Sequence, residues 1–392
     1  MERSFEYLNS FIIVITLLVI LMIPVIVYKN ITQKVMLNSD FVNYFTGARI
    51  LKSNERNNIY DIKTQIKYQN DFRGIMSVKN LPFRMLPIIA ILFLPLTYVD
   101  YFIGYKIWLL INLILGVVAY YLMTKECGIK KPYLGLILLL CLPVLGNVLL
   151  GQVVFIFLIV LIYVYKYLKV ENVFAAGLLC SLLIIRVQYL LFIPTIFLKI
   201  DKKKEFLKGF LLGILFVFSF SVILIGFRGL LSYPSFLIMT ETSDFGSNFR
   251  SFQSIYPYLR EFFGNLEWIF FIDLILNFVL YGIFLLFFSS KKKNISLEAA
   301  VSLGVVSTLI FGLHIYIHDL VLLLIPLFII VGRFVSKYRI FLFTLSFMIL
   351  LLPYIIRYIG FHFLIPILML VLMIYLLKLP KNDILVQRDL HI

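Results

Sequence analysis

The chain has 392 residues, of which 62% are apolar, 17% aromatic and only 14% charged. A soluble globular protein is about half apolar and about a quarter charged, so this composition excludes a water-soluble enzyme. The apolar residues fall in blocks of roughly 17 to 26, each long enough to cross the ~30 Å hydrocarbon core of a bilayer as a helix. We therefore predict an all-α polytopic membrane protein, with about 10 to 13 membrane segments in a single domain over 1–392.

Basic residues give the chain a formal net charge of +16 and lie in the short connections between apolar blocks. This pattern is typical of cytoplasmic turns, which carry an excess of Lys and Arg and contact anionic lipid headgroups. No motif that reads RNA or DNA accompanies the charge, so the expected partners are membrane lipids rather than nucleic acid. The basic residues concerned are Lys125, Lys130, Lys131, Lys166, Lys169, Lys199, Lys202, Lys203, Lys204, Lys208, Lys291, Lys292, Lys293, Arg333, Lys337 and Arg339.

The first apolar block, 11–28, follows a short polar leader and has no small-residue cleavage site after it. We interpret it as a retained signal anchor with the N-terminus inside. The basic clusters then place two long polar stretches, 29–81 and 228–265, on the exoplasmic side and the tail 378–392 in the cytoplasm. We expect a multi-pass protein of the plasma membrane.

If every apolar block crossed the membrane once, successive connections would alternate between the two sides. Two blocks do not fit this alternation. The block 83–99 contains Pro87 and Pro95, and the block 173–198 has Arg186 and Gln188 at its middle. Broken backbone at membrane depth is tolerated where protein or a water-filled cavity covers it. We predict that both blocks are re-entrant pairs of half-helices. The alternative is that they cross once and that several lysines face outward.

The first outer loop contains a candidate amphipathic helix that begins next to an aspartate. Its apolar residues recur at helical spacing, which predicts a short helix lying on the membrane face. Asp40 precedes this helix in the N-cap position, where a carboxylate accepts backbone N–H bonds and stabilises a helix by about 0.5–2 kcal/mol. A purely structural role for Asp40 is therefore one interpretation. The apolar residues are Phe41, Tyr44, Phe45, Ala48 and Leu51.

Several stretches together resemble GT-C glycosyltransferases, and more narrowly glycosyltransferase family 87, the polyprenyl-phosphate-mannose-dependent α-mannosyltransferases. The first is Asp40-Phe41-x-x-Tyr44-Phe45-x-x-Ala48, followed by Ile59-Tyr60-Asp61. Further stretches follow in the same order: Leu86-Pro87 with Leu94-Pro95-Leu96 and Trp108, Gly151-Gln152-Val153, Ala176-Gly177 with Arg186, and His318-Asp319-Leu320. The chain departs from the family pattern at Val154, Arg186-Val187 and Leu320, where Asn, Lys-Pro and Tyr are usual. These departures concern sugar and acceptor recognition rather than the type of reaction.

The resemblance implies a GT-C-like fold and an inverting transferase. A hexose, mannose in the family, would pass from a polyprenyl-phosphate donor to a hydroxyl of a lipid- or glycan-linked acceptor on the exoplasmic side. The catalytic residues implied are Asp40, as general base, and His318. The implied donor-binding residues are Arg186, Gln188, Gln152, Tyr44, Arg84, His314 and Asp319. No cofactor and no metal is expected, because the lipid donor is already activated.

Ionisable groups inside apolar blocks have structural interpretations as well. Arg186 suits a donor phosphate, because a guanidinium gives two parallel N–H bonds, but it also suits an ion pair with Asp273. Arg84 begins its block, where snorkelling to the headgroups is a sufficient explanation.

His314 and His318 are four residues apart and would share one helical face. Such a pair is a familiar metal geometry, yet no third ligand is evident. The remaining interpretations are a hydrogen bond to substrate and a satisfied buried histidine.

The second outer loop, 228–265, combines polar groups with aromatic rings. Gln253-Ser254 followed by Arg260 resembles a family stretch, which implies an acceptor-binding role for these three residues. An interfacial loop at headgroup level is the structural interpretation.

Two other classes of function share these features. A lipid-linked-sugar flippase or transporter also places charges and broken helices in the membrane, but it requires access from both sides. A glycan polymerase subunit also carries a large outer loop.

Overall fold

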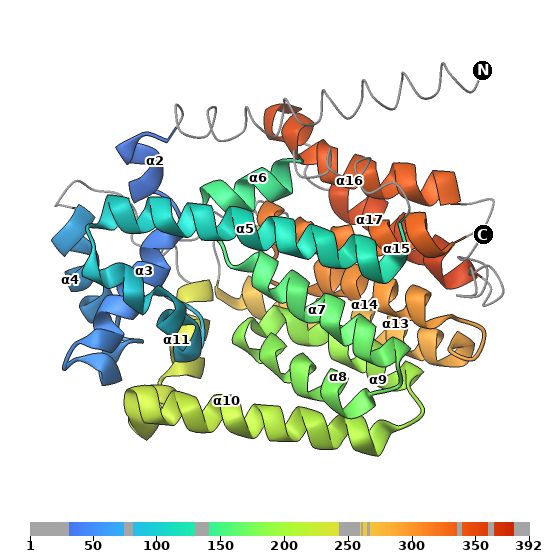
Figure 1. Cartoon of the computed structure of the whole chain (residues 1–392), viewed down its shortest axis with the longest axis horizontal. Helices are drawn as coiled ribbons and strands as arrows, with labels where there is room; N and C mark the ends of the chain where they lie inside the picture. The colour runs from blue at the N-terminus through green and yellow to red at the C-terminus, as the bar shows by residue number, and fades with distance from the viewer. Residues whose placement is uncertain are drawn as a thin grey trace.

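The structure is a computed structural model that describes residues 31–73, 81–129, 141–242, 259, 262–264, 267–334, 339–359 and 364–379 (Figure 1). The predicted anchor 11–28, the predicted acceptor residues Gln253, Ser254 and Arg260, and nearly all of the predicted tail lie outside these residues.

The described ranges are helical and contain no β-strand. The α-helices are α2 (Gln33–Leu37), α3 (Phe41–Lys52), α4 (Ile62–Arg73), α5 (Tyr101–Cys127), α6 (Leu142–Leu149), α7 (Val154–Lys169), α8 (Val173–Cys180), α9 (Phe192–Lys199), α10 (Lys203–Leu231), α11 (Tyr233–Thr242), α13 (Glu267–Lys291), α14 (Leu297–Phe311), α15 (Leu324–Arg333), α16 (Arg339–Ile359) and α17 (Leu364–Lys378). The 3₁₀ helices are η1 (Arg56–Asn58), η2 (Pro87–Tyr98), η4 (Ser181–Ile185), η5 (Val187–Leu191) and η7 (Ile317–Leu323).

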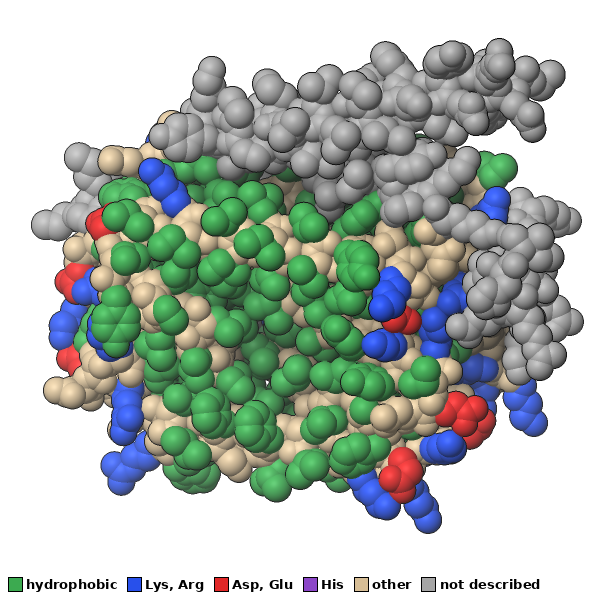
Figure 2. All heavy atoms as spheres, in the orientation of Figure 1, with side chains coloured by type: hydrophobic (Ala, Val, Ile, Leu, Met, Phe, Trp, Pro, Cys, Tyr) green, Lys and Arg blue, Asp and Glu red, His purple; other side chains and the backbone are tan. Residues whose placement is uncertain are grey.

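Within the described residues, 3 helices are long and apolar enough to cross a membrane: Tyr101–Cys127, Lys203–Leu231 and Trp268–Lys291. Shorter apolar helices surround them. In Figure 2 hydrophobic side chains form a broad band across the middle of the molecule, and Lys, Arg, Asp and Glu gather toward the two ends of the band. This distribution is the one that a bilayer requires, because charged groups are costly in hydrocarbon. The predicted class, an all-α polytopic membrane protein, is confirmed.

The long helices α5 and α10 extend between two different ends of the molecule (Figure 1). At one end, α10 finishes against the first polar segment, where Gly229 packs on the backbone of Asn57. At the other end, Nζ of Lys169 binds the carboxylate of Glu126 at 3.4 Å, and Nη2 of Arg333 donates to the Glu126 carbonyl. Several basic turns therefore share the end opposite to α3.

The segment 83–99 differs from its prediction. It contains one 3₁₀ helix, η2, with Pro95 inside it, rather than a pair of half-helices. Both of its ends contact the first polar segment: Gln65 accepts from the N–H of Phe83 at 2.8 Å, and Nζ of Lys52 lies 3.5 Å from the Tyr98 ring centroid. Both ends of the segment therefore lie beside the first polar segment, as a re-entrant block requires, although its interior is a single helix.

The block 173–198 is broken at Arg186, which has extended backbone dihedrals (φ −122°, ψ 91°) between η4 and η5. The outer ends of the two halves meet, because Nζ of Lys202 lies 3.1 Å from the carboxylate of Glu171. The half-helices therefore form a hairpin with Arg186 at its tip. This arrangement agrees with the predicted re-entrant pair.

Candidate active site

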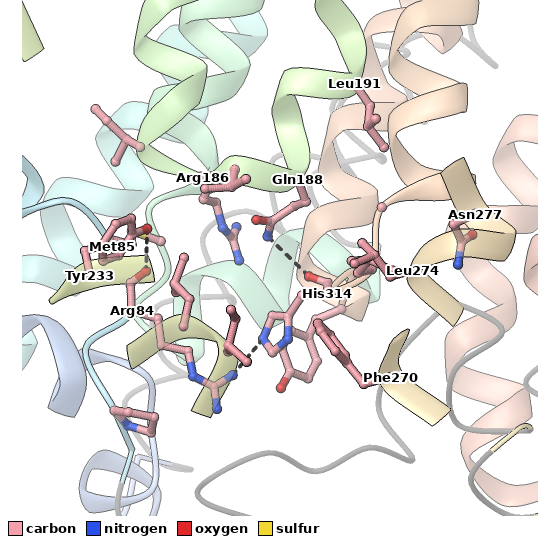
Figure 3. A pocket seen from close by; sticks show the side chains of 18 of the residues that line it. Arg84, Met85, Arg186, Gln188, Leu191, Tyr233, Phe270, Leu274, Asn277 and His314 are labelled. Atoms are coloured by element: carbon pink, nitrogen blue, oxygen red, sulfur yellow. Dashed lines mark hydrogen bonds between the residues drawn. The ribbon is translucent and has the colours of Figure 1, made fainter. Parts of the chain in front are cut away.

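A cavity of about 350 Å³ lies between the start of α3, the tip of the 173–199 hairpin, α11 and α13 (Figure 3). Its wall is polar at one end and apolar at the other. The polar residues that line it are Asp40, Asn43, Tyr44, Arg84, Gln152, Arg186, Gln188, Tyr233, Asn277, Tyr281, His314 and Tyr316. Seven of the nine residues predicted for catalysis and donor binding therefore share one cavity, although they come from segments far apart in the chain.

Asp40 owes its position to a tight turn between α6 and α7. The N–H of Phe41 donates to the carbonyl of Leu150 at 3.0 Å, which joins the start of α3 to this turn. Gly151 has a positive φ of 69°, and a Cβ on it would lie 2.8 Å from Cβ of Phe41. Only glycine fits both conditions. The indole of Trp108 donates to the Gly151 carbonyl at 2.8 Å and fixes the turn.

The next residue in this turn, Gln152, holds the Asp40 carboxylate. Its Nε2 donates to Oδ2 of Asp40 at 2.6 Å, and its Oε1 accepts from the hydroxyl of Tyr44 at 2.8 Å. Tyr44 thereby determines which way the Gln152 amide faces. These contacts indicate that Gln152 and Tyr44 orient Asp40, whereas the sequence suggested direct contacts with the donor.

The predicted capping role of Asp40 is wrong. Asp40 occupies the N-cap position of α3, but its side chain makes no capping hydrogen bond. Its carboxylate accepts from Gln152 instead. The pKa of Asp40 is raised from its ordinary value of 3.8 by burial, while the Gln152 hydrogen bond and the positive charge of Arg186 oppose that rise. Burial therefore makes this carboxylate a stronger base than an exposed one.

Arg186 is held from behind by a buried network. Its Nη1 donates to Oδ1 of Asp319 at 2.5 Å and to the hydroxyl of Tyr189 at 2.9 Å, and the Tyr189 hydroxyl in turn donates to Asp319. Its Nη2 lies 3.4 Å from Nε2 of His318. The predicted structural alternative, an ion pair between Arg186 and Asp273, is therefore wrong. Arg186 pairs with Asp319, which lies in η7.

His318 and Asp319 are not among the residues that line the cavity, and both are buried. Both contact Arg186, Asp319 through an ion pair and His318 through Nε2, which lies 3.4 Å from Nη2 of Arg186. In this structure they help to fix the position of Arg186, and their predicted contacts with the substrate stay predictions.

A second polar group faces the hairpin tip in Figure 3. Nε2 of Gln188 donates to the carbonyl of His314 at 3.2 Å, and Nη1 of Arg84 lies 3.4 Å from Nε2 of His314. Nη2 of Arg84 donates to the carbonyl of Thr240 at 2.7 Å, so Arg84 is bound to α11 rather than snorkelling.

The predicted common helical face for His314 and His318 is wrong. His314 lies in a turn before η7, and His318 lies inside η7. The described residues contain no group of three or more His, Cys, Asp or Glu side chains that would hold a metal ion.

Sequence reasoning missed several residues of this region, among them Asn43, Asn277 and Tyr189. Asn43 lines the cavity and stands three residues after Asp40, so helical spacing alone could have found it. Asn277 is a polar residue inside a membrane helix, which is also a readable signal. Nothing in the sequence marked Tyr189 as a site residue, because an aromatic residue in an apolar block most often packs in the hydrophobic core.

The apolar end of the cavity opens onto the hydrophobic surface. Ile238 of α11 and Phe278 of α13 both line the cavity, yet their exposed fractions are 48% and 60%. Ile275 and Val279, which also belong to α13, are exposed as well. The wall of the cavity therefore continues into the apolar surface that these two helices form.

Fold and cavity define a polytopic membrane protein in which an oriented carboxylate and a buried arginine share one cavity that opens onto the apolar surface. The model of glycosyltransferase family 87 matches residues 87–312, which is more than half of the chain. The chain therefore belongs to glycosyltransferase family 87 and is a membrane glycosyltransferase. Comparison with curated proteins gave no match, and neither did comparison with solved structures.

Proposed function

We propose that the protein is an inverting hexosyltransferase that moves a sugar, mannose in the first instance, from a polyprenyl-phosphate donor to an acceptor hydroxyl. The observation that carries this proposal is that Asp40 and Arg186 line one cavity, whose apolar end opens between α11 and α13. A prenyl chain suits the apolar end, and its phosphate and sugar suit the polar end. The matched segment begins at Pro87, so the role of Asp40 rests on this geometry.

In the proposed reaction Asp40 acts as general base. Gln152 binds Oδ2 of Asp40, and Oδ1 takes the proton from the acceptor hydroxyl. The acceptor oxygen attacks the anomeric carbon from the face opposite the phosphate. The bond between that carbon and the phosphate oxygen breaks, and its electron pair leaves with the polyprenyl phosphate. A single displacement inverts the anomeric centre, so a β-linked donor gives an α-linked product.

Arg186 stabilises the departing phosphate in this proposal. A guanidinium has five N–H donors. The contacts to Asp319, Tyr189 and His318 use only part of them. The remaining N–H groups can bind the phosphate as its negative charge increases. Because Asp319 and the hairpin hold the guanidinium in place, little reorganisation accompanies the reaction.

We further propose that the cavity faces the exoplasmic side of the plasma membrane. Its polar end lies beside α3, at the end of the molecule opposite to the basic turns around Glu126. Basic turns favour the cytoplasm.

Transfer by the purified protein is the direct test. The protein in lipid vesicles is incubated with radiolabelled polyprenyl-phosphate mannose and an alkyl α-mannoside, and the labelled product is separated and its anomeric configuration determined. We expect an α-linked product without added metal. A labelled donor that crosses the vesicle membrane without sugar transfer would favour a flippase instead, and a β-linked product would exclude the single displacement.

The pH dependence of transfer should report on Asp40. Because the ionised carboxylate is the active form, the rate should fall as pH falls through the pKa of Asp40, and burial places this limb above the ordinary value of 3.8. The Gln152 hydrogen bond lowers that pKa, so Gln152→Leu should move the acid limb to higher pH. The measurement is the rate over a pH series for both proteins. A uniform loss of rate with an unmoved limb would exclude orientation of Asp40 by Gln152.

A further inference from the structure

Helix α13 carries a polar pair inside its apolar sequence. Asp273 and Asn277 are four residues apart, and their exposed fractions are 1% and 3%. Nδ2 of Asn277 donates to Oδ1 of Asp273 at 2.9 Å and to the Asp273 carbonyl at 2.8 Å, which uses both of its hydrogens. Oδ2 of Asp273 and Oδ1 of Asn277 are buried and have no hydrogen-bond partner among the described residues. Unpaired oxygens in a membrane helix are unfavourable, which suggests that a ligand pairs with them.

Asn277 belongs to the cavity described above. It lines the cavity together with Phe270, Leu274, Phe278 and Tyr281, which share one face of α13. At a rise of 1.5 Å per residue, this face extends for about 16 Å along the helix, and Asn277 lies about 15 Å from Glu267. The cavity therefore reaches roughly half the thickness of the ~30 Å hydrocarbon core at Asn277.

The chemistry of this position selects for a hydrogen-bond donor. Both hydrogens of the Asn277 amide are used by Asp273, so only its Oδ1 remains for a ligand. A prenyl chain has no N–H or O–H group, and an ionised phosphodiester has only acceptor oxygens. A hydroxyl group satisfies the position, because it donates to an amide oxygen. The tail and the phosphate of the proposed donor therefore do not account for Asn277.

We infer that Asn277, oriented by Asp273, is a hydroxyl-binding subsite for the acceptor. This inference rests on the proposed function and deepens it, because it names the class of acceptor. An acceptor that carries its own lipid can keep that lipid against the apolar surface at Ile238 and Phe278 while its head group reaches Asn277. The acceptor is thus a glycolipid rather than a free glycan.

The experiment uses the purified full chain in lipid vesicles, with radiolabelled polyprenyl-phosphate mannose as donor. Octyl α-mannoside and its monodeoxy analogues serve as membrane-partitioning acceptors, and methyl α-mannoside serves as the soluble one. We expect the wild type to prefer octyl over methyl α-mannoside. Asn277→Leu should raise the KM for octyl α-mannoside about tenfold, as expected for one lost hydrogen bond, and leave the donor KM and kcat unchanged. For one deoxy analogue, the wild type and Asn277→Leu should have the same KM.

Controls separate this inference from the proposed function. Leu286→Ala changes an exposed residue of the same helix that does not line the cavity and should leave both KM values unchanged. Asn277→Leu leaves the buried carboxylate of Asp273 without its donor, so its thermal unfolding temperature should fall. The double variant Asp273→Leu, Asn277→Leu removes both partners and should unfold at or above the wild-type temperature while it keeps the raised acceptor KM. If the wild type transfers sugar but Asn277→Leu has an unchanged acceptor KM, or an equally raised donor KM, the subsite is excluded. If the wild type transfers no sugar to any acceptor, the proposed function fails, and the subsite with it.

Discussion

Asn in place of Asp40 is expected to reduce sugar transfer by about 10² to 10⁴-fold, the usual contribution of a general base. The side chain keeps its size, and its oxygen can still accept the hydrogen bond from Gln152, so the start of α3 should keep its structure. The amide cannot take up the acceptor proton. The measurement is kcat with radiolabelled polyprenyl-phosphate mannose and octyl α-mannoside, alongside the thermal unfolding temperature.

A matched control is available in the same segment. Asp71→Asn makes the same chemical change in α4, where the carboxylate forms an exposed ion pair with Arg49 at 3.2 Å, away from the cavity. Exposed pairs contribute about 0–1 kcal/mol, so this variant should retain both stability and activity. Wild-type rates for Asp40→Asn would remove Asp40 from the mechanism.

The second large effect is expected at Arg186. Replacement by alanine removes the proposed phosphate contact and should weaken donor binding more than acceptor binding. It also leaves the Asp319 carboxylate buried without its 2.5 Å partner, and breaking a buried pair costs about 3–5 kcal/mol of stability. A fall in the activity of Arg186→Ala could therefore come from weaker donor binding or from lower stability of the folded protein.

The double variant Arg186→Met, Asp319→Leu separates the two effects. Replacing both members of a buried pair by apolar residues is often neutral or stabilising, so this protein should remain folded. We expect its thermal unfolding temperature to approach that of the wild type, while transfer falls by at least about 10²-fold because the phosphate loses its cation. Full activity in the folded double variant, or equal effects on the KM values of donor and acceptor, would make Arg186 a purely structural residue.

Much of the site was predictable from local sequence, because each motif carries its own chemistry. Gly151-Gln152 marks a turn that only glycine permits, and the arginine in the middle of an apolar block marks a broken helix. The pairing of charges was not predictable in this way. Asp273 and Asp319 are both acidic residues in apolar surroundings, and nothing in the spacing reveals which of them meets Arg186.

Asp40 illustrates the same limit at shorter range. Its position before α3 favours a capping role on local grounds, since Asp is a preferred N-cap residue. The hydrogen bond from Gln152, 112 residues away in the chain, competes for the same carboxylate and prevails. A contact over that distance depends on how α3 and the turn before α7 pack, which local propensity does not encode.

Membrane insertion, the helical class and the presence of intramembrane charges followed from the sequence by itself. The reason is that a bilayer requires long apolar helices, so each charged or polar residue within an apolar block can be recognised directly in the sequence. The tertiary structure alone decided that Gln152 and Tyr44 orient Asp40, that His318 and Asp319 stand behind Arg186, and that Asn277 reaches the cavity. These relations depend on side-chain packing between elements distant in the chain, where hydrogen-bond geometry over a few tenths of an ångström selects one partner among several.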